Sequence, residues 1–244
     1  MIQETITYSC DRCGSTNIVR NGTNKCGNSQ YHCKDCGAYR VLKKTQRSQI
    51  SKEQVLKTYR ERASLRGIER IFGVARQTVM KWIATWVAQL PKLIDTLLPA
   101  RAGDVLEVDE MWSFVARKLD KRWIWTVICR RTRQIIAFVI GDRSEATCRR
   151  LWEAIPSAYR GCRSFSDFWR AYANVFPTHT HQQVGKETGE TAHMERWYNT
   201  VRQRLARFTR KTLAFSKNDL NHELITRWFI IEYNLEILRS SLTI

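Results

Sequence analysis

The chain has 244 residues, and 41 Lys or Arg against 23 Asp or Glu give it a formal net charge of +18. A surplus of this size is typical of proteins that bind the phosphate backbone of nucleic acids. Hydrophobic residues make up 43% of the chain, which excludes a disordered protein and supplies a buried core. No run of 18 apolar residues occurs, and the first eight residues lack the pattern of a signal peptide, so we expect no membrane association.

The first 45 residues are polar and rich in cysteine. Two C-x2-C pairs, with 19 residues between them, have the spacing of a four-cysteine zinc ribbon; they are Cys10 with Cys13 and Cys33 with Cys36. A glycine follows each pair, Gly14 and Gly37, as suits a turn in which backbone amides face the sulfurs. We therefore expect residues 1–45 to bind one structural Zn²⁺.

A reduced, metal-free cluster or a redox pair is the alternative for these cysteines. Cys26 and His32 lie nearby, but Cys26 has no partner two residues away and His32 adjoins Cys33, so we expect both to be bystanders. The scattered Cys129, Cys148 and Cys162 lie in apolar or helical stretches and are expected to be core residues. A basic stretch, 42–47, is a plausible linker.

Residues 50–99 have helical periodicity. Ser51 and Gln54 are spaced as a capping box that begins a first helix, on which Val55, Tyr59 and Arg62 share a face. A second helix is predicted over 64–72, with Gly73 as the turn, and a third over 75–90. Four apolar residues of this segment are expected to be core positions: Leu65, Ile68, Ile71 and Val74.

This pattern predicts an all-α helix-turn-helix DNA-binding domain over residues 50–99. Arg76, Gln77 and Lys81 fall on the outward face of its last helix, and their side chains are of the types that contact bases and phosphates. An ordinary helical hairpin with solvated charges is the alternative.

Residues 104–244 alternate strand and helix patterns in the order βββαβαβα. Strands are predicted over 105–112, 123–130 and 134–140, a helix over 144–155, and a short strand that ends near Asp167. A short helix to Phe176, a strand over 178–183, and long helices over 191–208 and 216–239 follow. The fold class is therefore α/β, a mixed sheet flanked by helices.

Several acidic residues stand out in this strongly basic chain. The strand period places Glu107 and Asp109 on one face and Glu110 on the other. Asp167 lies at the end of a strand, where α/β sheets usually present their chemistry. Glu195 lies one turn into a helix, with Asn199 and Arg202 on the same face.

Carboxylates are the ligands that Mg²⁺ prefers, and a pair of metal ions supports in-line phosphoryl transfer. Asp109, Asp167 and Glu195 are therefore candidate ligands of two Mg²⁺ ions, or of Mn²⁺. The alternative is that these acids are structural salt-bridge partners of the many arginines.

Three segments resemble the insertion-sequence-one family of bacterial transposases: 108–112, 166–167 and 194–217, which ends in Arg210-Lys211-Thr212-Leu213-Ala214-Phe215-Ser216-Lys217. The resemblance implies a zinc finger, a helix-turn-helix and a ribonuclease-H-like domain with Asp109, Asp167 and Glu195 as its catalytic triad. It also implies double-stranded DNA as the partner, both transposon ends and target, a homo-oligomer that is at least a dimer on DNA, and a place at the nucleoid in the bacterial cytoplasm.

The sequence departs from the family pattern at Phe168, where the family often has glycine. Glu223, beside His222, is a candidate for a fourth acidic position. His179, His181 and His193 flank the third acid and are more often ordinary core or surface residues than ligands. Two other functions fit the same modules, a transcription regulator whose last domain only dimerises, and a structure-selective nuclease.

Overall fold

The computed structural model describes residues 7–25, 27–41 and 50–242. The chain forms two compact units, Met1–Ile50 and Ser51–Ile244. The segments 50–99 and 104–244, predicted as separate domains, thus lie within one unit apart from residue 50, and their division into two domains stays a prediction. Cys26 and the linker predicted at 42–47 lie outside the described residues.

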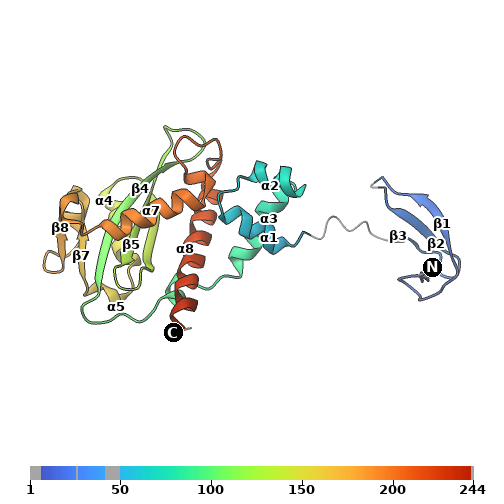
Figure 1. Cartoon of the computed structure of the whole chain (residues 1–244), viewed down its shortest axis with the longest axis horizontal. Helices are drawn as coiled ribbons and strands as arrows, with labels where there is room; N and C mark the ends of the chain where they lie inside the picture. The colour runs from blue at the N-terminus through green and yellow to red at the C-terminus, as the bar shows by residue number, and fades with distance from the viewer. Residues whose placement is uncertain (1–6, 26, 42–49, 243–244) are drawn as a thin grey trace, which may run out of the picture. The chain divides into compact units, whose positions relative to one another are not determined.

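The first unit is a three-stranded antiparallel sheet in the order β1-β2-β3 (Figure 1). Its strands are β1 (Ile18–Thr23), β2 (Ser29–Cys33) and β3 (Tyr39–Val41). Its core is small: apart from Cys10 and Cys33, only Tyr31 and Ala38 are buried hydrophobic residues among those of this unit that the structure describes. So little apolar surface cannot hold a unit of this size together without a further constraint.

The second unit begins with three helices, α1 (Lys52–Arg60), α2 (Leu65–Phe72) and α3 (Arg76–Ala88). The predicted capping box is present, with the Ser51 hydroxyl accepting from the Gln54 amide at 3.0 Å. Gly73 ends α2 with φ of +64°, as expected for a glycine stop. The turn between α2 and α3 therefore falls where the sequence predicts it.

Two predictions for these helices are wrong. Ile71 is not a core residue, because α2 buries Ile68 alone and leaves Ile71 68% exposed. Arg62 does not continue the face of Val55 and Tyr59, because α1 ends at Arg60 and Arg62 has a φ of +65°. Arg62 lies beyond the end of its helix, whereas Ile71 lies within α2 on its exposed face.

The centre of the second unit is a five-stranded mixed sheet in the order β6-β5-β4-β7-β8. Its strands are β4 (Val105–Phe114), β5 (Lys121–Cys129), β6 (Ile135–Gly141), β7 (Arg163–Ser166) and β8 (His181–Gln183). The first three pair antiparallel, whereas β7 runs parallel to β4, and β8 runs parallel to β7. The predicted mixed sheet flanked by helices is confirmed.

Helices cover both faces of this sheet. They are α4 (Glu145–Ala154), α5 (Ser157–Arg160), α6 (Arg170–Val175), α7 (Ala192–Arg204) and α8 (Asp219–Leu242), with short 3₁₀ turns η1 (Leu93–Thr96), η2 (Lys186–Thr188) and η3 (Ala206–Phe208). Leu106 and Val108 pack in one core with α4 and α6, and the intervening Glu107 accepts the Met194 amide of α7 on the other face. The predicted helix over 191–208 is interrupted after Arg204.

Side-chain bonds join α1 and α3 to α8 and η3. The Trp86 indole donates to Glu232 at 2.8 Å, and Arg60 pairs with Glu236 at 2.5 Å. The buried Arg207 guanidinium donates to the Tyr59 hydroxyl at 2.7 Å. These contacts explain why residues 51–244 form one unit. Among the described helices, none has the length and apolar character needed to cross a membrane.

Candidate functional site

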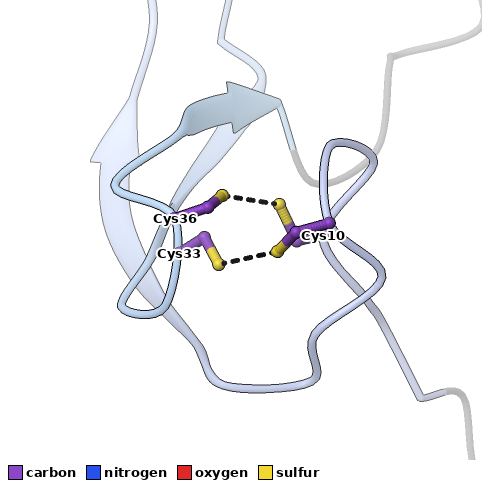
Figure 2. A group of neighbouring side chains, drawn as sticks. Cys10, Cys33 and Cys36 are labelled. Carbon is purple, nitrogen blue, oxygen red and sulfur yellow. Dashed lines mark hydrogen bonds between the residues drawn. The ribbon is translucent and has the colours of Figure 1, made fainter.

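The four cysteines of the two C-x2-C pairs lie together in the first unit (Figure 2). The Cys10 and Cys36 sulfurs are 3.7 Å apart, and the Cys13 and Cys33 sulfurs are 3.6 Å apart. Four sulfurs about 2.3 Å from a tetrahedral zinc ion would be separated by about 3.8 Å. A disulfide requires about 2 Å. The donor set and its spacing therefore fit a four-coordinate zinc ion.

The backbone around these cysteines supports thiolate ligands. Gly14 and Gly37 adopt φ of +75° and +70°, and their amides donate to the carbonyls of Cys10 and Cys33. The Arg12 amide lowers the pKa of the Cys10 thiol to about 6, which favours the charged form that metals bind. The pKa of Cys13 is raised to about 12 because its lowering by the Ser15 amide is outweighed by the neighbouring Cys36 and Cys33 sulfurs and by burial, so a cation is needed to ionise all four thiols. His32 stacks on a tyrosine ring and is not part of the cluster.

A second cluster lies on the sheet of the second unit, where carboxylate oxygens of Asp109, Glu110 and Asp167 are within 4.8 Å of one another. The parallel pairing of β4 and β7 accounts for this proximity. Glu107 pairs with Phe165, and the same register continued for two residues puts Asp109 opposite Asp167. The structure thus brings together two of the three predicted acids, Asp109 and Asp167. It adds Glu110, which the strand period predicts on the opposite face of β4.

Glu110 differs from its neighbours because both of its oxygens are engaged. One accepts from Arg143 at 2.6 Å and the other from the Tyr172 hydroxyl at 2.5 Å. Among the residues that the structure describes, Asp109 and Asp167 accept only backbone amides, those of Glu110 and Trp169. Within the described part of the chain, neither aspartate forms an ion pair.

Glu195 lies in the first turn of α7, exposed and outside the 4.8 Å cluster. It is nevertheless electrostatically coupled to the site. Burial raises the pKa of Asp109 to about 7, and the negative charges of Glu110, Asp167 and Glu195 add to the shift. Asp109 of β4, Asp167 directly after β7 and Glu195 of α7 therefore repel one another electrostatically, and a bound cation would relieve this repulsion.

Two further predicted residues lie on α7. Asn199 is exposed, and Arg202 is half-buried. Burial lowers the pKa of Arg202, with a further lowering from Arg210, and the charge of Asp109 opposes this. Arg202 is therefore close enough to the acids to place positive charge beside them.

Glu107 has a role that the sequence left open. Its carboxylate is fully buried and accepts the backbone amides of His193 and Met194 at 2.9 and 3.0 Å. It also bonds the His193 ring at 2.5 Å and Arg130 at 3.0 Å. Thr191 provides no side-chain cap for α7, so Glu107 caps this helix from the neighbouring strand and fixes the turn that carries Glu195.

We expect Glu107→Ala to destabilise the second unit by about 3–5 kcal/mol, because it leaves Arg130 and the first amides of α7 without their acceptor. Urea unfolding of the variant measures this loss. Glu223→Ala is the matched control, since Glu223 is an exposed acid on α8 and its loss should change stability by less than about 0.5 kcal/mol. Equal stabilities for the two variants would contradict this role for Glu107.

The remaining candidates lie apart from the acid cluster. His181 bonds the hydroxyls of Ser164 and Ser166, and burial lowers its pKa to about 4. His193 bonds Glu107, whereas His179 and Glu223 are exposed and form no part of the cluster. The interpretation of these histidines as ordinary core and surface residues fits their positions.

Three predicted DNA-contact residues lie on α3. Arg76, Gln77 and Lys81 are all exposed on this helix. The Arg76 guanidinium pairs with Glu69 of α2 at 3.0 Å, and both side chains remain about half exposed. These three side chains are accessible to a ligand.

Residues 104–235 match the family described as IS1 transposase. The chain is also 34% identical over 128 residues to the insertion element iso-IS1n protein InsB of Shigella dysenteriae, which covers 52% of this chain and 93% of that protein. Similarity to the IS1 protein InsB of Shigella flexneri is 33% over 128 residues, with 52% and 95% covered. The family match includes all three acids of the predicted triad. The chain therefore belongs to the IS1 transposase family.

Proposed function

We propose that this protein binds the terminal inverted repeats of its insertion sequence and catalyses metal-dependent DNA strand cleavage and strand transfer. The catalytic residues are Asp109, Asp167 and Glu195, in a ribonuclease-H-like domain. One observation carries the proposal. In a chain of net charge +18, none of these three acids forms an ion pair among the described residues. Structural acids would be expected to pair with arginine here, as Glu107 and Glu110 do.

Two Mg²⁺ or Mn²⁺ ions held by these carboxylates would activate the attacking oxygen and stabilise the leaving oxygen of a phosphodiester. The oxygens that Asp109 and Asp167 leave without side-chain donors suit such hard cations. Glu195 would complete the ligand set from α7, and the basic Arg202 would hold the DNA backbone beside it. These roles are assigned to the three positions that match the acidic motif of the family: Asp109, Asp167 and Glu195.

For the first unit we propose one structural Zn²⁺ on Cys10, Cys13, Cys33 and Cys36. The spacing of the sulfurs supports a closed tetrahedral site, and a site with four protein ligands leaves no position for a substrate. The role of this unit is DNA binding, together with α1–α3. A dimer on DNA stays a prediction.

The proposal is tested with DNA that carries the ends of the element flanking this gene. Asp109→Asn, Asp167→Asn and Glu195→Gln should each abolish Mg²⁺-dependent cleavage and leave DNA binding nearly intact, because the amides keep the shape and lose the charge. Glu223→Gln, the same change at an exposed acid outside the cluster, should stay active. A folded, DNA-binding Glu195→Gln enzyme that still cleaves would remove the third ligand from the proposal.

Recognition of the ends should depend on α3. We expect Arg76→Ala and Lys81→Ala each to weaken binding to the ends by about 1–3 kcal/mol where a base contact is lost. Lys57→Ala is the matched control, since Lys57 is an exposed lysine of α1 paired with Glu53. Fluorescence anisotropy with end and unrelated duplexes measures both affinities. Unchanged affinity in both α3 variants would place recognition elsewhere.

A structure-selective nuclease and a DNA-binding regulator are the other functions compatible with these modules. The two aspartates without an ion pair among the described residues argue against the regulator, because a dimerisation domain gains nothing from a half-buried aspartate whose pKa is raised to about 7. The nuclease is distinguished only by its products, since it would cut the DNA ends and never join them.

A further inference from the structure

Phe168 presents an exposed aromatic ring directly beside the acid cluster. It follows Asp167, and its side chain is 69% exposed. Its neighbours are held firmly: the Asp167 carboxylate accepts the Trp169 amide at 3.0 Å, and the Gln183 side chain donates to the carbonyls of both residues at 3.0 Å. The exposure of Phe168 is thus imposed by a fixed loop.

The loop is also packed from behind. The Arg143 guanidinium lies 4.0 Å from the Trp169 ring and donates to Glu110 at 2.6 Å. This stacking connects the aromatic loop after β7 to the acids of β4. Phe168 directly follows the proposed metal ligand Asp167, and the Cα atoms of consecutive residues are about 3.8 Å apart.

A cleft of about 290 Å³ opens at this point. Its walls combine aromatic and apolar groups with two cations: Phe168, Trp169, Val184, Arg143 and Lys186, beside Asp167. Lys186 is exposed and forms no ion pair within the described residues. A flat apolar wall with adjacent positive charge is complementary to a nucleobase and its phosphate.

We propose that this cleft takes an unpaired nucleobase of the DNA next to the scissile phosphate, stacked on Phe168, with Lys186 against a flanking phosphate. The inference rests on the proposed function, which places that phosphate at Asp109 and Asp167. A base inside a duplex has both faces covered by its neighbours, so only a base that has left the stack can use the ring.

The test is a cycle of two proteins and two DNAs. The binding affinities of the wild type and Phe168→Ala for end duplexes are measured in Ca²⁺. One set of duplexes has all its bases, and in the other a single abasic site is placed in turn at each nucleotide that flanks the cleavage point. At one position the substitution should weaken binding about 5- to 150-fold, which corresponds to roughly 1–3 kcal/mol per stacked base. On the DNA that is abasic at that position, the same substitution should change affinity less than twofold.

Phe168→Trp should bind the normal DNA as tightly as the wild type, because it keeps an aromatic ring at this position. Ile94→Ala, at an exposed apolar residue of η1 beside β6, should change the affinity for neither the normal nor the abasic DNA. If Phe168→Ala lost affinity equally for normal and abasic DNA, or lost none, the inference would be overturned. Cleavage of the ends by the wild type would still support the proposed function in that case. A Phe168→Ala protein that changed its mass in sedimentation without DNA would assign the ring to a protein contact and overturn it as well. Failure of the wild type to bind or cleave the ends would overturn both.

Discussion

Asp109→Asn is expected to raise the stability of the metal-free second unit at pH 8 and, in the same protein, to abolish DNA cleavage. Burial and the neighbouring acids raise the pKa of Asp109 from 3.8 to about 7, so ionising it in the folded state is costly. Each pKa unit corresponds to about 1.4 kcal/mol, which sets an upper limit of about 4 kcal/mol for the gain on removing the charge. Each kcal/mol should raise the melting temperature by about 2–4 °C.

The sign of the pH dependence follows from proton linkage. Between pH 3.8 and pH 7 the folded state retains a proton at Asp109 that the unfolded state has lost, so the stability of the wild type falls as the pH rises through this window. The advantage of Asp109→Asn should therefore be full at pH 8 and disappear near pH 4. Thermal melts of both proteins at the two pH values, without added Mg²⁺, measure it.

The opposite result would identify a structural acid. If Asp109 stabilised the fold by pairing with an arginine, Asp109→Asn would melt at a lower temperature and lose activity only in proportion to unfolded protein. Asp104→Asn provides this comparison, because Asp104 pairs with Arg131 at 2.5 Å and this pair lowers the pKa of the Asp104 carboxyl. We expect it to be destabilised under the conditions that stabilise Asp109→Asn.

Loss of zinc should unfold the first unit and leave the second folded. Four buried hydrophobic residues, two of them cysteines of the cluster, are too few to hold residues 7–41, whereas structural zinc contributes roughly 10–16 kcal/mol in small zinc domains. Cys33→Ser is therefore expected to contain no zinc by elemental analysis and to be cut rapidly within its first 50 residues by protease. The fragment that remains should begin near Ser51.

Cys162→Ser is the matched control for this experiment, since Cys162 is a half-buried thiol of the second unit outside the cluster. It should retain one zinc ion per chain and the protease resistance of the wild type. A Cys33→Ser protein that kept both would contradict a structural role for the metal.

Much of this architecture can be predicted from local sequence. Runs of β-branched and aromatic residues predict β4, β5 and β6. The two-residue strand period places Glu107 and Glu110 on opposite faces of β4, as their contacts with α7 and α6 confirm. The cysteine spacing predicts the sulfur cluster, and Gly73 predicts the end of α2. These features depend on residues close together in the chain, which is why periodicity and spacing reveal them.

The features that the sequence could not predict depend on distant contacts. The identity of the cap of α7 is one, because Glu107 lies 86 residues from His193. The engagement of Glu110 by Arg143 and Tyr172 is another, since no local pattern links these positions. The strands of the first unit escaped prediction because they are short and polar, so that the sulfur cluster and not apolar burial determines their pairing.

Strand transfer itself is the measurement that tests this account most directly. Duplexes that end in the free 3′-OH of the element are incubated with supercoiled plasmid, Mg²⁺ and the wild-type protein, and covalently joined products are separated on a denaturing gel. The account predicts joined products that require Mg²⁺ and are missing with Glu195→Gln. Hydrolysed ends without any joined product, from a folded wild-type protein that binds the ends, would contradict it and identify a nuclease.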